Sequence, residues 1–343
     1  MSLRLAINGY GRIGRCALRL LERAGAADAG AEVVLINDLG PREAIVHLTR
    51  YDSTHGRFEA RIEDDAEGGG MRIDGRAVQI ASQPLPGGNF WGDAGIDLVL
   101  ECSGKFASRE GGEMHLAAGA PRVLIGAPAG EDVDATIVWG INEHLLDAGA
   151  RIVSAASCTT NCMAHLLVPL NGAVQIVSGA YTTVHAYTND QRLIDSPHTD
   201  LRRARAAANA IVPTTTWADR ALAWVVPELA GRLSGTSMRV PVLNVSCIEL
   251  NLIGERTLPV GALNQLMRDY SEGSDGVLDW CDAPLVSVDF NGSPASGVFD
   301  ATRTQVQGEL MRVSAWYDNE WGYANRMLDI IRRWSRLLSG QGA

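Results

Sequence analysis

The stretch LRLAINGYGRIG at residues 3–14 decides the fold. Its first six residues are mostly apolar and predict a short buried strand over residues 3–8. Three glycines follow at positions 9, 11 and 14, and helical periodicity then runs over residues 16–23. Residues 32–38 read as a second strand. This order of elements is a βαβ unit, which requires parallel pairing of its strands and a right-handed crossover.

Further apolar segments continue this pattern to about residue 155. They lie at residues 96–101, 122–126 and 151–154, and polar or helical stretches separate them. We therefore expect residues 1–155 to form an α/β domain of the Rossmann type, with a doubly wound parallel sheet.

The second half of the chain has a different pattern. A helix is expected over about residues 158–170, followed by strand-like segments at residues 180–187, 237–254, 285–290 and 309–316. These lengths favour an α+β domain with a largely antiparallel sheet over residues 156–322. The amphipathic segment at residues 323–338 predicts a terminal helix, which we expect to pack back on the first domain.

Composition excludes several classes of protein. Of the 343 residues, 46% are hydrophobic and 20% are charged, which is typical of folded domains rather than disordered chains. The net charge of -10 opposes general binding to nucleic acid. We expect a cytoplasmic protein, because no long apolar run or signal sequence is visible, and free thiols at all six scattered cysteines.

The glycine-rich turn predicts a dinucleotide site. Gly9 allows the tight turn, Gly11 lets the backbone approach a pyrophosphate, and Gly14 lets the helix pack closely on the strand. Asp38 ends the next strand, where a carboxylate accepts ribose hydroxyls and repels a 2'-phosphate, so NAD is favoured over NADP. The alternative is a structural turn with a solvated Asp38.

A reactive thiol is predicted at Cys158. Ser157 is a good helix N-cap, so Cys158 falls in the first turn of a helix, where the backbone N–H groups and the helix dipole lower a thiol pKa. His185, at the end of a strand, can face it and lower that pKa further as an imidazolium. The alternative is an inert buried thiol. The sequence predicts no metal site, because Cys158 and Cys162 lack two further ligands at suitable spacing.

Motifs over nearly the whole chain resemble one family. They include INGYGRIGR from Ile7, ASCTTNC from Ala156, YTNDQ from Tyr187 and WYDNEWGY from Trp316. The chain resembles phosphorylating glyceraldehyde-3-phosphate dehydrogenase and its close relative erythrose-4-phosphate dehydrogenase. The resemblance implies two domains, a homotetramer, one NAD per subunit, and oxidation of a phosphorylated aldehyde through a cysteine thioester.

The resemblance also implies roles for individual residues. Cys158 matches the family nucleophile and His185 the base. The residues expected to bind NAD are Gly9, Gly11, Arg12, Ile13, Gly14, Asp38, Ser103, Asn319 and Tyr323. Substrate phosphate is expected at Thr188 and Arg239, with Asp190 beside them, and inorganic phosphate at Ser157, Thr159, Thr216 and Trp217. Arg203 and Arg205 either contact a ligand or pair within their own loop.

Three positions depart from the family pattern. Trp217 replaces the glycine that usually follows the pocket threonine, Ala155 replaces an asparagine, and Gly126 replaces a serine. An indole at position 217 either obstructs inorganic phosphate or points away from the pocket and leaves phosphorolysis intact.

Two other functions fit part of these observations. REGGEMHLAAGA, PLVSVDFN and ANRMLD also resemble erythrose-4-phosphate dehydrogenase, in which water replaces phosphate. The segment YTNDQRLIDSPHTDLRRARAAA favours the triose enzyme instead. A non-catalytic NAD-binding sensor is the third reading, and the presence of both Cys158 and His185 opposes it.

Overall fold

The computed structural model describes residues 2–85 and 87–340. The chain forms two compact units, which are described separately below. The first contains residues up to Ala156 together with those from Ala324 onward, and the second is Ser157–Tyr323.

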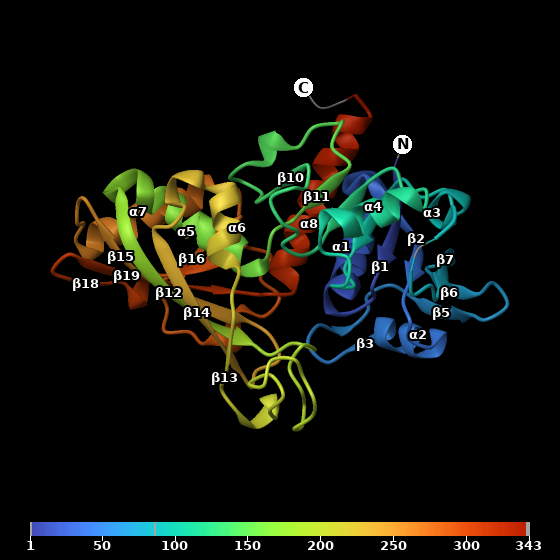
Figure 1. Ribbon diagram of the computed structural model, residues 1–343, viewed down its shortest axis with the longest axis horizontal. Coiled ribbons are helices and arrows are strands. Elements are labelled where there is room, and N and C mark those ends of the chain that lie inside the picture. Colours follow the sequence, from blue (N-terminus) through green and yellow to red (C-terminus); the bar gives the residue numbers. More distant parts are fainter. Residues whose placement is uncertain (1, 86, 341–343) are drawn as a thin grey trace. The chain divides into compact units, whose positions relative to one another are not determined.

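The first unit is built on a nine-stranded sheet (Figure 1). Its strand order is β10 (Ala135–Thr136), β11 (Ile152–Ser154), β9 (Val123–Ile125), β8 (Leu98–Glu101), β1 (Leu3–Asn8), β2 (Ala31–Asn37), β7 (Arg76–Ala81), β6 (Gly70–Ile73) and β5 (Ile62–Asp65). All neighbours from β10 to β7 pair in parallel, whereas β7, β6 and β5 form an antiparallel meander. The predicted parallel α/β sheet is confirmed.

Helices connect the strands of this sheet. They are α1 (Arg12–Ala29), α2 (Arg42–Arg50), α3 (Phe90–Asp93), α4 (Arg109–Ala117) and the 3-10 turn η1 (Glu143–Leu145), and a small hairpin joins β3 (Tyr51–Asp52) to β4 (Gly56–Arg57). Apolar side chains of the strands pack with Trp91 from α3, which is fully buried. Burying an indole of this size contributes strongly to stability, because aromatic side chains remove the most area from water.

The last helix, α8 (Trp321–Leu338), contributes its residues from Ala324 onward to the first unit. Ser335 lies against Gly30, the left-handed C-cap of α1, where an added Cβ would be 2.6 Å from the Cβ of Ser335. Arg332 forms an ion pair with Asp28 at the same end of α1.

The second unit has a mixed, mainly antiparallel sheet. Its order is β13 (Val212–Thr214), β14 (Leu233–Val240), β12 (Ile176–Ala186), β15 (Ser246–Gly254), β19 (Leu310–Tyr317), β17 (Gly297–Asp300) and β16 (Leu278–Cys281), with β18 (Gln305–Gln307) beside β19. Its helices are α5 (Cys158–Val174), α6 (Ala218–Val225) and α7 (Val260–Gly273), with short 3-10 turns η2 (Ala207–Asn209), η3 (Pro227–Leu229), η4 (Ser287–Phe290) and η5 (Ala301–Arg303).

Two predicted strands of this unit were wrong. Residues 237–254 do not form one strand, because Pro241 and the left-handed Val245 (φ 68°) interrupt it and β12 lies between the two halves. Residues 285–290 contain the turn η4 instead of a strand, and the Asp289 carboxylate accepts the Val286 backbone N–H at 2.9 Å. Local side-chain bonding of this kind favours turns over strands.

Within residues 2–85 and 87–340, every helix is too short or too polar to cross a lipid bilayer.

Candidate active site

The glycine-rich turn lies between β1 and α1. Gly9 has φ +88°, and an added Cβ would lie 2.4 Å from the Cα of Ser103 on the neighbouring strand end. A Cβ on Gly14 would lie 2.5 Å from the Gly9 carbonyl oxygen, whereas one on Gly11 would meet nothing within 4 Å. Gly9 and Gly14 are therefore required by packing. Gly11 leaves open space at the start of α1, where no side chain of the described residues caps the helix N–H groups, and an anionic pyrophosphate fits this place.

The half-buried Asp38 follows β2, next to this turn. Its two carboxylate oxygens accept the backbone N–H groups of Tyr10 and Gly40, both at 2.8 Å. Each oxygen keeps a lone pair that can accept a ribose hydroxyl. The side chain of Arg12 is already paired with Asp52, at 2.9 Å between Nη2 and Oδ1. Arg12 and Ile13 can therefore offer a ligand at the start of α1 chiefly their backbone N–H groups.

Cys158 is the first residue of α5. Ser157 caps this helix, and its Oγ accepts the Thr160 N–H at 3.1 Å. The buried Ala156, which precedes Ser157, has φ +55°, a backbone conformation that residues other than glycine rarely adopt. Cys162, one turn later, is fully buried, and its Sγ would lie 2.7 Å from a Cβ on Gly297. Cys162 therefore packs, whereas Cys158 is half-buried.

His185 faces Cys158 from the end of β12. The distance from its Nε2 to the Cys158 Sγ is 3.6 Å, and its Nδ1 lies 2.6 Å from the carbonyl oxygen of Ala186. A carbonyl only accepts, so the tautomer that bonds to it carries its proton on Nδ1 and turns the lone pair of Nε2 toward the thiol. This is the orientation that a general base requires.

The structure alters one electrostatic expectation for this pair. Burial raises the pKa of the Cys158 thiol, while the nearby charge of Arg239 acts to lower it. Burial, and then the same Arg239 charge, lowers the pKa of His185 to about 3. The imidazole is therefore neutral near pH 7, and it is Arg239 that acts to stabilise a thiolate here, rather than the expected imidazolium.

Arg239 lies beside His185 because of the strand register. In the parallel pairing of β12 with β14, the Cα atoms of His185 and Arg239 are partners. The Arg239 Nη1 lies 2.7 Å from the His185 Nδ1 and 3.2 Å from the Ala186 oxygen. An arginine only donates, so Nδ1 accepts while it is bonded to Arg239, and the tautomer with its proton on Nδ1 requires the guanidinium to bond to the Ala186 oxygen instead. Its buried Nε has no hydrogen-bond partner among the described residues. A half-buried guanidinium with an unused donor is suited to a phosphate.

The other two residues expected at the substrate phosphate, Thr188 and Asp190, bond to neighbouring side chains. The Thr188 hydroxyl donates to Gln191 Oε1 at 3.1 Å, and the Asp190 carboxylate accepts from Arg203 Nη1 at 2.6 Å. Arg203 also donates to Thr215 Oγ1 at 2.9 Å, and Arg205 pairs with Asp195 at 3.1 Å. Both arginines thus pair within the loop between β12 and β14, which is one of the two expected alternatives.

The residues expected at inorganic phosphate lie at two helix starts. Ser157 and Thr159 open α5, where the Thr159 hydroxyl bonds to the Tyr317 hydroxyl at 2.9 Å. Thr216 and Trp217 precede α6, and Thr216 Oγ1 accepts the Ala218 N–H at 3.2 Å. The Trp217 side chain is 57% exposed, and the guanidinium carbon of Arg220 lies 4.6 Å from its ring centroid. The indole therefore stacks with Arg220 toward solvent.

Asn319 and Tyr323 lie in the second unit, and both are buried. The Asn319 Oδ1 accepts a hydrogen bond from the Ser246 hydroxyl at 2.8 Å. This bond turns the amide N–H groups the other way, where they can donate to the carbonyl of a ligand. Sequence reasoning missed Ser246 and Tyr317. Tyr317 lies inside the WYDN motif, so its position next to Asn319 was the available signal.

The remaining two departures from the family pattern are buried. Ala155 is fully buried before the strained Ala156. A Cβ on Gly126 would lie 3.0 Å from the Met327 Cε, so the methionine of α8 fills the space that a serine side chain would need.

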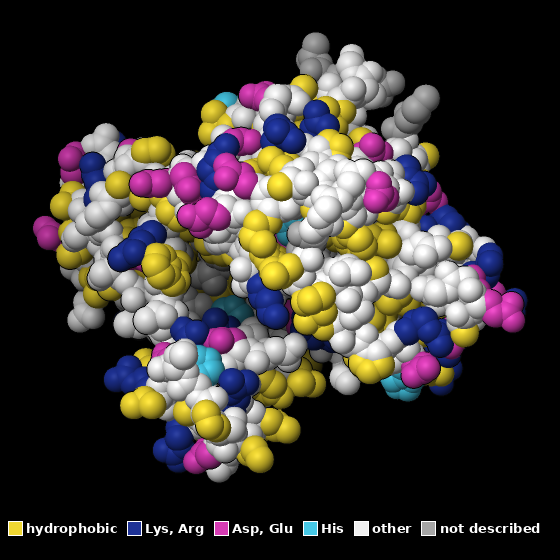
Figure 2. Space-filling view, turned by 45° about the vertical axis from the view of Figure 1, so that its right-hand side comes forward, with side chains coloured by type: hydrophobic (Ala, Val, Ile, Leu, Met, Phe, Trp, Pro, Cys, Tyr) yellow, Lys and Arg dark blue, Asp and Glu magenta, His cyan; other side chains and the backbone are white. Residues whose placement is uncertain are grey.

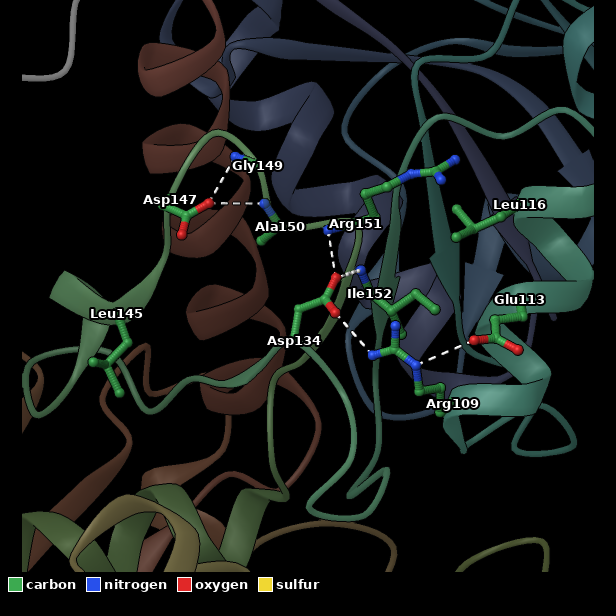
Figure 3. A pocket seen from close by; sticks show the side chains of 10 residues that line it. All are labelled: Arg109, Glu113, Leu116, Asp134, Leu145, Asp147, Gly149, Ala150, Arg151 and Ile152. Atoms are coloured by element: carbon green, nitrogen blue, oxygen red, sulfur yellow. Dashed lines mark hydrogen bonds and ion pairs between the residues drawn. The ribbon is translucent and has the colours of Figure 1, made fainter.

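The first unit also contains a surface hollow of about 710 Å³ (Figure 3). The sticks show three of its charged groups bonded to one another: Arg109 bridges Glu113 and Asp134, and Asp134 also accepts the backbone N–H groups of Arg151 and Ile152. These carboxylates stabilise the fold around β11, and none of the expected site residues lines the hollow.

A sheet with a dinucleotide turn, together with a paired cysteine and histidine beside a half-buried arginine, defines an NAD-dependent oxidoreductase. Residues 3–109 match the family model described as the NAD binding domain of glyceraldehyde 3-phosphate dehydrogenase, and residues 157–319 match its C-terminal domain.

Curated relatives agree with these matches. The glyceraldehyde-3-phosphate dehydrogenase of Pseudomonas aeruginosa is 50% identical over 329 residues, which cover 96% of this chain and 97% of the relative. The plasmid form from Cupriavidus necator is 49% identical over 330 residues with the same coverage, and the Geobacillus stearothermophilus protein is 44% identical over 333 residues, again with 96% and 97% covered. The chain belongs to the glyceraldehyde-3-phosphate dehydrogenase family.

Proposed function

We propose that this chain oxidises D-glyceraldehyde 3-phosphate to 1,3-bisphosphoglycerate with NAD and inorganic phosphate. The observation that carries the proposal is the 3.6 Å approach of the Cys158 Sγ to the His185 Nε2, with Arg239 beside them. The choice of the triose phosphate as substrate is based on the names of the relatives. A sensor without catalysis has no need for this arrangement.

The first step is the addition of Cys158 to the aldehyde. The neutral His185 takes the thiol proton at Nε2 while Sγ bonds to the carbonyl carbon, and the proton passes to the carbonyl oxygen. The product is a thiohemiacetal on Cys158. Backbone N–H groups at the start of α5 stabilise the charge that develops on the oxygen.

The second step is oxidation. Gly9, Gly11 and Gly14 would hold the dinucleotide at the start of α1, and Asp38 would hold a ribose. When bound, NAD supplies the hydride acceptor. His185 removes the hydroxyl proton of the thiohemiacetal as the hydride leaves its carbon, and a thioester remains on Cys158.

Release of the product needs a second anion. Ser157, Thr159 and Thr216 supply hydroxyl groups for inorganic phosphate, whose oxygen attacks the thioester carbon and expels the Cys158 thiolate. Arg239 and Thr188 hold the substrate's own phosphate. A phosphate on Arg239 also draws its guanidinium away from the His185 Nδ1, which favours the tautomer in which Nδ1 donates to Ala186.

We also infer a homo-oligomer, as in the expected tetramer. The loop between β12 and β13 exposes four large apolar side chains, with 72% of Leu193, 72% of Ile194, 82% of Leu201 and 68% of Ile211 accessible. Figure 2 shows hydrophobic and basic side chains together on this loop, in the lower left of the view. A cluster of this kind is typical of an interface.

We also infer a cytoplasmic location for the protein, because its thiol must stay reduced.

The decisive experiment measures NADH formation with glyceraldehyde 3-phosphate and with erythrose 4-phosphate, each with and without inorganic phosphate. Fast, phosphate-dependent turnover of the triose supports the proposal. Preferential turnover of the tetrose without phosphate would instead identify the erythrose-4-phosphate branch. An inactive protein that binds NAD would be the sensor.

A further inference from the structure

One buried carboxylate takes no part in the reaction proposed above. Glu101 ends β8 and is 1% exposed. Its Oε1 accepts the backbone N–H of Ser103 at 2.7 Å and the Ser103 hydroxyl at 2.5 Å. Its Oε2 is bonded to Asn8 Nδ2 at 2.5 Å and to His115 Nε2 at 3.0 Å. Burying a carboxylate is unfavourable unless such bonds compensate.

The histidine partner has a fixed tautomer. The indole N–H of Trp91 can only donate, and it lies 3.1 Å from His115 Nδ1. The neutral ring must therefore accept at Nδ1 and carry its proton on Nε2. His115 is fully buried, so no water competes, and its Nε2–H donates to Glu101.

The orientation of the Asn8 amide, the other group that donates to Oε2, is fixed by Asn37. The backbone of Gln83 donates to Asn37 Oδ1 at 2.8 Å and accepts from Asn37 Nδ2 at 2.9 Å, which determines the orientation of that amide. Asn37 Nδ2 also donates to Asn8 Oδ1 at 2.7 Å. The NH2 group of Asn8 must then point at Glu101. Both groups that donate to Oε2 are thus held in one orientation, because the donor and acceptor roles of their own partners are fixed.

These constraints determine the polarity of the Ser103 hydroxyl. A serine hydroxyl has one proton and two lone pairs. The proton is given to Glu101, and one lone pair accepts the Lys105 N–H at 3.1 Å. The remaining lone pair can accept a hydrogen bond, so the hydroxyl can bind a donor and cannot bind a phosphate oxygen, which only accepts.

Ser103 lies at the dinucleotide turn. Its Cα and N are the atoms that a Cβ on Gly9 would approach to 2.4 Å, and the side chain is half-buried. Glu101, Asn8 and Asn37 are the last residues of β8, β1 and β2, three adjacent parallel strands. In open α/β sheets, ligands bind outside these carboxyl ends.

We propose that Glu101 is a positioning residue that orients the Ser103 hydroxyl as an acceptor, so that Ser103 binds a hydroxyl or amide N–H of the dinucleotide. This inference rests on the proposed NAD site and assigns the polarity of one of its contacts.

Glu101→Gln tests the orientation. If the new NH2 group replaces Oε2, it meets two fixed N–H donors, from Asn8 and His115. If it replaces Oε1, it meets one, from the Ser103 backbone, and it then donates to the Ser103 hydroxyl. The second orientation has fewer repulsive contacts. It turns the serine proton toward the ligand and removes the acceptor.

The experiment measures the dissociation constant of NAD by calorimetry for four variants. Ser103→Ala is expected to weaken binding about fivefold, the usual effect of one lost hydrogen bond. Glu101→Gln is expected to weaken it at least as much, and the double variant no more than about twofold beyond Ser103→Ala, because Glu101 acts through Ser103. Ser103→Thr keeps the hydroxyl and is expected to retain affinity.

A matched control is Asn142→Asp. Asn142 is 4% exposed in the same unit, and its NH2 donates to the Thr136 carbonyl at 2.8 Å. This exchange places a carboxylate oxygen against the Thr136 carbonyl oxygen, two acceptors, at a position away from the glycine-rich turn. It is therefore expected to lower thermal stability and to leave NAD affinity unchanged.

Three outcomes would overturn the inference: normal NAD affinity in Ser103→Ala, normal affinity in Glu101→Gln, or a double variant weakened by the product of the single effects. If Glu101→Gln does not fold, the comparison of Ser103→Ala with Ser103→Thr still tests the hydroxyl contact that the inference requires, and normal affinity in Ser103→Ala overturns it. A wild-type protein that binds no NAD would instead contradict the proposed function, so the two failures are distinguishable.

Discussion

The thiol of Cys158 and the Nε2 of His185 lie 3.6 Å apart although 27 positions separate them in the chain. The start of α5 supplies the first group and the end of β12 the second. We expect Cys158→Ser to abolish thioester formation while NAD still binds. We expect His185→Asn to slow hydride transfer roughly 10²–10⁴-fold, the usual effect of losing a general base.

Rapid-mixing measurement of the first turnover tests both variants. NAD affinity serves as the control, because neither substitution changes the glycine-rich turn. A His185→Asn protein that transfers hydride at the normal rate would exclude His185 as the base.

Arg239 is expected to set the reactivity of the thiol. Its charge acts to lower the pKa of Cys158 against the effect of burial, so Arg239→Leu should move the pH profile of alkylation to higher pH and slow the reaction near neutrality. Iodoacetamide is the suitable reagent, because it carries no charge that Arg239 could attract. An unchanged profile would show that Arg239 does not act on the thiol.

Trp217 is expected to tolerate replacement. Since its indole is exposed and stacks on Arg220, Trp217→Gly should leave the Michaelis constant for inorganic phosphate within about twofold, well below the effect of one lost phosphate contact. Steady-state kinetics at saturating triose and NAD measure this constant, and Thr216→Ala, which removes an expected phosphate ligand, is the comparison. A large fall in the constant for Trp217→Gly would show that the indole obstructs phosphate.

Acid should destabilise the second unit through His185. Its pKa of about 3 in the folded protein lies below the ordinary value of 6.5, so the unfolded chain binds a proton first as the pH falls. The contribution to stability is complete above pH 6.5 and is lost between there and about pH 3, by up to about 1.4 kcal/mol per pH unit.

Urea unfolding near pH 7 and near pH 5 tests this expectation. His185→Asn should lose that part of the pH dependence, whereas replacing the exposed His144 with asparagine should not. Equal slopes for wild type and His185→Asn would contradict it.

The apolar loop is expected to hold the oligomer together. Ile194→Glu places a charge among the exposed apolar side chains of this loop and should produce smaller species in light scattering. Leu145→Glu, at a leucine of the first unit that is 52% exposed, is the control. Unchanged mass for Ile194→Glu would remove the loop from the interface.

Much of the fold could be predicted because its signals are local. The apolar run at residues 3–8, the glycines and the following helix indicate a βαβ unit without any distant contact, and β1, α1 and β2 confirm it. The errors arose where one residue overrides a pattern. Asp289 turned the apolar segment 285–290 into η4, and Pro241 with Val245 interrupted residues 237–254.

The site was less predictable, because its contacts join distant residues. Motifs singled out Cys158 and His185, but Arg239 reaches His185 only through the register of β12 with β14. The bonds from Glu101 to Asn8 and His115 span 93 and 14 positions. None of these residues has a local signal for its partner, so only the folded structure could identify the network.

The pairing of His185 with Arg239 on neighbouring strands limits how this protein can be re-engineered. Because the two Cα atoms are register partners in a parallel ladder, neither side chain can shift along the sheet by one residue without facing its opposite side. A larger or smaller aldehyde must therefore be accommodated by the loop after β12, which can change in length, while the base and its guanidinium stay in place.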